Sequence, residues 1–170
     1  MTDFDEFLRK RNEERSATVR DIHLNFADQG KEWQWLKDEL RRITEGRKLG
    51  TEAFEWPTYP APYPDFLTLG DVAVVFATPA IATLAPQIYR LMFVRRPFRA
   101  NEVSNIGAPI PAVNWLLSLQ HSEGVGYWIV KEDGLRLPTP QFAVKIAERL
   151  VEYFDSYTAA LRAKYPGFRF

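Results

Sequence analysis

Two long stretches without a charged side chain lie in the middle of the chain. Residues 72–89 read VAVVFATPAIATLAPQIY, and residues 103–122 read VSNIGAPIPAVNWLLSLQHS. Neither contains Asp, Glu, Lys or Arg, whereas the sequence on both sides of them carries many charges in helical patterns. This layout predicts a buried core that contains a β-sheet and is packed by amphipathic helices.

The length of the uncharged stretches raises the question of membrane spans, and their composition argues against it. Residues 72–89 contain Pro79 and Pro86, and the Val72–Phe76 run favours a strand over a helix. Residues 103–122 contain two asparagines, a glycine and two prolines. A spanning helix needs about 20 predominantly apolar residues and satisfies its backbone internally. We therefore expect no membrane partner.

The totals predict one globular domain over residues 1–170. Hydrophobic residues make up 46% of the 170 residues and aromatic residues 14%, which is enough for one well-buried core. Lys and Arg together number 22, as do Asp and Glu, so no overall field attracts nucleic acid and its binding is disfavoured. The first residues, MTDFDE, are acidic where a secretory signal would be basic and then apolar, which predicts a cytoplasmic protein.

The chain contains no cysteine and only two histidines. Without thiols, disulfides, thiolate zinc sites, iron–sulfur clusters and thiol catalysis are excluded. His23 and His121 lack the one-turn spacing of a helical zinc motif, and no glycine-rich nucleotide-binding motif is complete. We therefore expect neither a bound metal nor a cofactor.

Residues 1–50 predict a helical hairpin. Apolar residues follow helical spacing in two groups that Gly30 separates, and Gly46 is the expected stop of the second helix. The first group is Phe4, Phe7, Leu8, Val19, Ile22 and Phe26, and the second is Trp33, Leu36, Leu40 and Ile43. Residues 51–66 follow as an extended strap rich in proline and aromatic residues, whose rings we expect to cover the domain's own core. Its Pro57–Pro60 spacing also matches the bare pattern read by proline-recognition domains.

Residues 67–170 predict a sheet-containing core that ends in a long helix. Strands are expected at 67–77 and 87–95, a short helix from Pro111 to Leu119, and a hairpin of residues 125–131 and 135–137 around Asp133-Gly134. Thr139 is the expected N-cap of the C-terminal helix. The apolar stripe of this helix is Phe142, Ile146, Leu150, Tyr153, Tyr157 and Leu161. The expected fold class is α+β, with a mostly antiparallel sheet of about four strands packed by the N-terminal helical hairpin and this helix.

Arg95, Arg96, Phe98 and Arg99 form the sharpest local cluster of functional type. Three guanidinium groups and a ring just beyond a strand suit a phosphate or carboxylate group and a stacking partner. The alternative is that these arginines pair with carboxylates of the protein itself or across an oligomer interface. A nucleic-acid surface would require the cluster to converge with Arg41, Arg42, Arg47 and Lys48.

A small hydrolase is the enzymatic alternative. Its weak catalytic candidates are His121 as base, Ser104 as nucleophile and Glu123 as a nearby carboxylate, together with the Arg95–Arg99 cluster. The Gly-x-Ser-x-Gly elbow is missing. A deep pocket that contains both His121 and the arginines would favour this alternative.

The leading hypothesis is a non-catalytic interaction or assembly module that self-associates. The basis is the C-terminal helix, whose apolar arc is wider than the roughly 100° of a single packed face. The residues that widen it, and that we expect at an interface, are Val144, Val151, Phe154 and Leu161. A second copy of the chain, in a symmetric dimer, is the expected partner.

Overall fold

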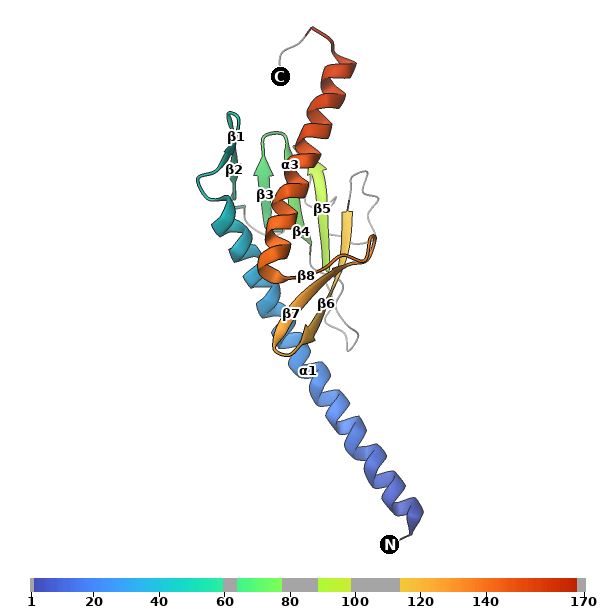
Figure 1. The fold of residues 1–170 in the computed structure, drawn as a ribbon. Coiled ribbons are helices and arrows are strands. Elements are labelled where there is room, and N and C mark those ends of the chain that lie inside the picture. Colours follow the sequence, from blue (N-terminus) through green and yellow to red (C-terminus); the bar gives the residue numbers. More distant parts are fainter. Residues whose placement is uncertain (1, 60–63, 78–88, 99–113, 168–170) are drawn as a thin grey trace.

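Two helices lie on one face of an antiparallel sheet (Figure 1). The structure, a computed structural model, describes residues 2–59, 64–77, 89–98 and 114–167, and within the first helix it describes the backbone but not the side chains of residues 15–29. Within these described residues the helices are α1 (Asp3–Thr44) and α3 (Thr139–Lys164). The two helices contact each other as well as the sheet, so the fold is α+β.

The sheet is a meander in which every strand pairs antiparallel with its neighbour in sequence. Within the described residues it has eight strands, so the expectation of about four was too low. The strands are β1 (Lys48–Leu49), β2 (Glu52–Glu55), β3 (Phe66–Leu69), β4 (Val72–Ala77), β5 (Tyr89–Arg95), β6 (Asn114–Ser122), β7 (Val125–Val130) and β8 (Arg136–Pro138). The undercount has three causes. The predicted strand 67–77 is two strands with Gly70 (φ 57°) in the turn between them, and short pairings such as β1–β2 leave little pattern. Strand β6 was expected to be a short helix.

Both faces of the central strands are buried, which accounts for the uncharged sequence. Successive side chains of a strand point to opposite faces. In β4, Val72, Val74 and Phe76 pack with the helices, whereas the alternate residues join a second apolar cluster. That second cluster is Phe66, Ala73, Val75, Ala77, Met92 and Val94, with Phe98 packed against it. A strand buried on both faces cannot carry charges, so it reads as a continuous apolar run.

The predicted N-terminal hairpin is instead one helix of 42 residues. Gly30 lies inside α1 because an exposed glycine in a helix interior costs only about 1 kcal/mol relative to alanine. Trp33, Leu36 and Leu40 are buried against the sheet, whereas the helix before them runs on beyond the sheet (Figure 1). The helix ends at Thr44, and Gly46 (φ 70°) follows, as expected from the glycine stop.

Residues 114–122 form strand β6 where a short helix ending at Leu119 was expected. Trp115 and Leu117 are buried, whereas Ser118 and Gln120 are exposed, so burial alternates along the strand. The cluster of apolar residues at 115–119 fits one helical turn as well as it fits a strand. These residues form a strand because they pair with both β5 and β7. The part of that helix before Asn114 lies outside the described residues.

The strap and the C-terminal helix are largely as expected. In the strap, Trp56 packs against the core and Tyr59 stacks on Phe66, while residues 52–55 are strand β2. In α3, Phe142, Ile146 and Leu150 are fully buried, and the helix ends before Pro166-Gly167. The N-cap is Pro138 rather than Thr139, because the Thr139 hydroxyl is bonded to side chains of other elements. No helix in the described part of the chain combines the length and the apolar character that a membrane crossing requires.

Candidate functional site

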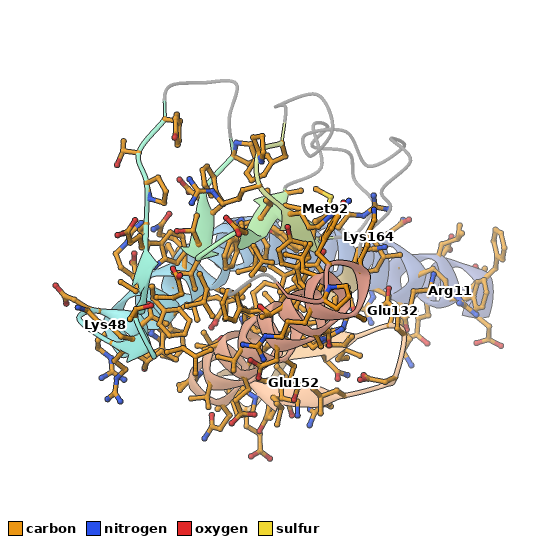
Figure 2. All side chains as sticks on the ribbon, turned by 90° about the horizontal axis from the view of Figure 1, so that it is seen from above. Arg11, Lys48, Met92, Glu132, Glu152 and Lys164 are labelled. Carbon is orange, nitrogen blue, oxygen red and sulfur yellow. The ribbon has the colours of Figure 1, made fainter. Side chains whose placement is uncertain are left out.

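The N-terminal segment of α1, residues 2–14, carries large apolar side chains that the domain does not cover. Phe4, Phe7 and Leu8 are 65%, 52% and 42% exposed. They are spaced by three and four residues, so they share one face of the helix. The Arg11 guanidinium lies 5.1 Å from the centre of the Phe7 ring on the same face. Figure 2 labels Arg11 on the N-terminal part of α1, which runs on beyond the sheet in Figure 1.

Local interactions favour helix in this segment without support from the domain. Thr2 and Asp5 form a capping box: the Thr2 hydroxyl oxygen accepts from the Asp5 backbone N–H at 3.2 Å, and the Asp5 carboxylate accepts from the Thr2 N–H at 3.4 Å. Asp3, Asp5 and Glu6 place negative charge in the first turn, where the helix dipole favours it. Arg9 and Glu13 add an ion pair one turn apart, with 3.1 Å between Nη1 and Oε1.

The arginine cluster is divided between two surfaces. Arg95 lies on the helix-facing side of β5, where its guanidinium is 5.6 Å from the centre of the Tyr157 ring of α3. Arg96 lies at the turn between β3 and β4, where its side chain donates to the Gly70 carbonyl at 3.3 Å. Within the described residues, neither arginine makes an ion pair, and Arg99 lies outside those residues. The described residues therefore supply no carboxylate partner for Arg95 or Arg96.

Arg96 and Phe98 line a cleft of about 390 Å³. Its other walls are Tyr59 of the strap, Phe66 of β3, Asp71 and Pro97. Phe66 stacks against Tyr59 at 5.6 Å between ring centres and meets Phe98 edge to face at 5.0 Å. The cleft therefore joins aromatic walls to one cation and one anion, on the side of the sheet that carries the second apolar cluster.

His121 does not meet the arginines. Tyr89 of β5 is opposite Leu117 of β6, Arg95 is six positions from Tyr89 in one direction, and His121 is four positions from Leu117 in the other. At about 3.3 Å per residue, this register separates the two side chains by roughly 30 Å. The single pocket that would have favoured the hydrolase is thus not present in the described structure.

Glu32 is the residue that His121 does approach, and no sequence pattern distinguished it among the many charges of α1. The distance between His121 Nε2 and Glu32 Oε1 is 3.9 Å, which is an ion pair only when the imidazole is protonated. The Thr139 hydroxyl donates to Glu32 Oε2 at 2.6 Å and accepts from the Trp128 indole N–H at 3.0 Å. The Glu32 carboxylate also packs directly against Gly126, because a Cβ added to this glycine would be 2.7 Å from the carboxylate.

This arrangement joins three elements, and the described residues place no nucleophile poised for attack in it. Thr139 is 0% exposed, and its proton is held by Glu32, so the chain Trp128–Thr139–Glu32 fixes α1 to β7 and to the start of α3. Glu123 lies nearby in the two-residue turn between β6 and β7, with a φ of 52°. Ser104 lies outside the described residues, and His23 lies in the part of α1 whose side chains are not described.

Burial raises the pKa values of two tyrosines, Tyr89 and Tyr153. Tyr89 is buried between Trp33 and Trp128, and desolvation of its phenolate raises the pKa. Burial also raises the pKa of Tyr153, against the opposing effect of Arg95 and Arg149. In the described part of the chain, no three carboxylate or imidazole side chains gather closely enough to hold a metal ion.

The basic residues named for a nucleic-acid surface are partly engaged by carboxylates. Arg42 forms hydrogen bonds to Glu39, and these bonds lower the pKa of the Glu39 carboxyl. Arg41 is 3.7 Å from Asp38 and lies over the Trp56 ring at 4.9 Å. These guanidinium groups are therefore part of an ion-paired helix surface rather than an unopposed basic patch.

The α3 residues expected at an interface have different surroundings. Val151 and Phe154 are half-buried and pack against the core of this chain. The Phe154 ring lies so close to Gly70 that a Cβ there would be 2.8 Å from it. Val144 is 45% exposed, and Leu161 is half-buried. The wide apolar arc of α3 is thus largely covered by the sheet and α1, and it does not by itself require a second copy.

No protein-family model, curated protein or solved structure matches this chain.

Proposed function

We propose that this protein is a non-catalytic interaction and assembly module that self-associates through the N-terminal segment of α1. The observation that carries the proposal is the exposure of Phe4, Phe7 and Leu8 on one face of a helix that extends beyond its own domain. Contiguous exposed apolar side chains rimmed by charges are typical of protein-binding surfaces. Rings on a helix face supply contact area at low cost in conformational entropy.

A lipid surface is the other environment that covers an amphipathic helix, and the charge of the segment disfavours it. Residues 3–14 contain five acidic side chains (Asp3, Asp5, Glu6, Glu13 and Glu14) and three basic ones (Arg9, Lys10 and Arg11). The net charge of −2 is repelled by anionic lipid, whereas helices that lie in membrane interfaces are rich in Lys and Arg on their polar face. A protein partner fits the segment better.

Sedimentation equilibrium over a concentration series tests the proposal. We expect the wild-type mass to rise with concentration from 19.7 kDa towards that of a dimer. Phe7→Ser removes the central ring and should keep the protein monomeric, whereas Val144→Ser, an exposed apolar change on α3, should behave as wild type. A wild-type protein that stays at the monomer mass up to millimolar concentration would contradict the proposal.

The cleft lined by Arg96 favours a second candidate function, the binding of a small aromatic anion. Three rings offer stacking surfaces, and the Arg96 guanidinium suits a carboxylate or phosphate group. Benzoate and phenyl phosphate are suitable probes in an NMR titration. Binding should shift resonances of residues 66–71 and 96–98 and should be lost in Arg96→Gln. Equal shifts in wild type and in this variant would exclude the cleft as the site.

A further inference from the structure

The charges that flank the exposed face of residues 2–14 are arranged to match a second copy of the same segment. With about 100° of rotation per residue, Phe4, Phe7, Leu8 and Arg11 form the face, and Asp3 and Lys10 lie together on one flank, two turns apart. The other flank carries Asp5 and Asn12. Arg9 and Glu13, which pair with each other, lie on the opposite side of the helix.

A two-fold axis perpendicular to two antiparallel helices brings each flank of one copy against the same flank of the other, in reverse order. Asp3 of each copy then meets Lys10 of the other, which makes two ion pairs. In a parallel arrangement, the two-fold axis runs along the helices and brings opposite flanks together, so Asp3 and Lys10 do not meet. The acid-then-base order along one flank therefore distinguishes the two arrangements.

We infer that two copies of this chain pair through antiparallel N-terminal segments of α1, with the two-fold axis beside Phe7 and with Asp3–Lys10 ion pairs between copies. This inference rests on the proposed function. In this register, Phe7 meets its own copy, and each Phe4 contacts Leu8 of the second copy. Each Arg11 extends over the outer edge of the opposing Phe4 ring, as it does over Phe7 within its own chain. Glu14, the other acidic residue on the flank, lies one turn beyond the ion pair.

The size of the contact sets the strength of the pairing. The shared segment covers only about three turns of each helix. The surface that such a short contact buries is smaller than the roughly 1,200 Å² of total surface that a stable interface buries. The dimer is therefore weak and reversible, and its ion pairs are exposed enough to respond to salt. This strength suits a module whose assembly depends on local concentration, because several such contacts reinforce one another when copies are held close together.

Exchange of charges between two variants tests the arrangement. In a dimer of Asp3→Lys, the new lysine of each copy lies opposite Lys10 of the other copy, so both ion pairs become repulsive. In a dimer of Lys10→Glu, the new glutamate of each copy lies opposite Asp3 of the other copy, which is repulsive as well. Each variant should dimerise about tenfold more weakly than wild type at low salt. An equimolar mixture restores both ion pairs in the heterodimer, so its dissociation constant should return to within about threefold of the wild-type value. The readouts are sedimentation equilibrium and native mass spectrometry of one isotope-labelled variant.

Glu6→Lys and Arg9→Glu provide the matched control. They make the same changes of charge on the side of the helix away from the face, so mixing them should give no preference for the heterodimer. Circular dichroism of every variant checks that α1 remains helical.

The outcomes separate the inference from the proposed function. If the wild type dimerises and Phe7→Ser abolishes the dimer, but the Asp3→Lys and Lys10→Glu mixture remains as weak as its components, self-association stands and the antiparallel arrangement is wrong. If the wild type is monomeric at all concentrations, both are wrong. If the wild type is monomeric but sediments with anionic vesicles through Phe7, the segment binds lipid, and both are replaced.

Discussion

The two ends of α1 share one pattern of apolar residues and have opposite surroundings. Phe4, Phe7 and Leu8 near the start are largely exposed, whereas Trp33, Leu36 and Leu40 near the end are at most 4% exposed. Both sets follow the helical spacing of three and four. Periodicity therefore defines a helix face but does not determine whether the chain itself covers that face.

The largest expected difference is between the same substitution at the two ends of the helix. Leu40→Ala removes a fully buried side chain and should lower the free energy of unfolding by about 2–5 kcal/mol. Leu8→Ala, on the exposed face, should change it by less than about 0.5 kcal/mol when the protein is monomeric. Urea unfolding at low micromolar concentration measures both. Equal losses in the two variants would mean that the N-terminal segment is also packed in the monomer.

Glu32 marks the point at which α1 becomes attached to the rest of the domain. Glu32→Ala removes the acceptor of the Thr139 hydroxyl and should cost about 1–3 kcal/mol of stability. Gly126→Ala puts a methyl group where the carboxylate lies and should displace Glu32 from Thr139. The double variant should therefore be less destabilised than the sum of the two single variants. Strict additivity in this double-mutant cycle would show that the two residues act separately.

Gly30 distinguishes one continuous helix from a hairpin. An added Cβ meets nothing within 4 Å, so Gly30→Ala should stabilise α1 by about 0.5–1 kcal/mol and increase the helical signal in circular dichroism. In a hairpin, glycine at the turn would adopt a positive φ, and alanine there would be destabilising. A lower melting temperature of Gly30→Ala would therefore support the hairpin.

The smallest expected effect is the response of the packed end to alkaline pH. Burial raises the pKa of Tyr89, whose ring centre is 4.5 Å from that of Trp33 of α1. The folded protein therefore keeps the phenolic proton more tightly than the unfolded chain does. The resulting stabilisation is complete below the unfolded pKa of about 10 and is lost as the pH rises above it. Tyr89→Phe should make the fall of unfolding free energy above pH 10 shallower, and an unchanged pH profile would contradict this.

Local sequence patterns predicted several elements correctly. The Val72–Phe76 run predicted a strand in a buried core, the stripe through Phe142, Ile146 and Leu150 predicted α3, and Asp133-Gly134 predicted the turn between β7 and β8. Each of these predictions depends only on residues that are close in sequence, because apolar runs, helical spacing and turn chemistry are all local patterns. Residues 115–119 were predicted wrongly, because a short apolar run fits either helix or strand until its pairing partners are known.

The candidate sites were less predictable, because they depend on residues that are distant in sequence. Arg95 and Arg96 are neighbours in the chain, yet one lies against Tyr157 of α3 and the other in the cleft with Tyr59. Glu32 and Thr139 are 107 residues apart, and no local pattern relates them. The exposed face of Phe4, Phe7 and Leu8 was visible as a pattern, but it was assigned to a hairpin that would have buried it.

The sequence by itself determined that the N-terminal residues are helical with an apolar stripe and that the sheet has a buried centre, but it placed a break at Gly30 that α1 does not have. Only the tertiary structure decided how much of that stripe is covered, because coverage depends on the length of the helix relative to the length of the strands. A helix of 42 residues is about 63 Å long at 1.5 Å per residue. The longest strand, β6, has nine residues and spans roughly 30 Å. A sheet of this height covers only part of such a helix, so the apolar face at the end that extends beyond it stays exposed.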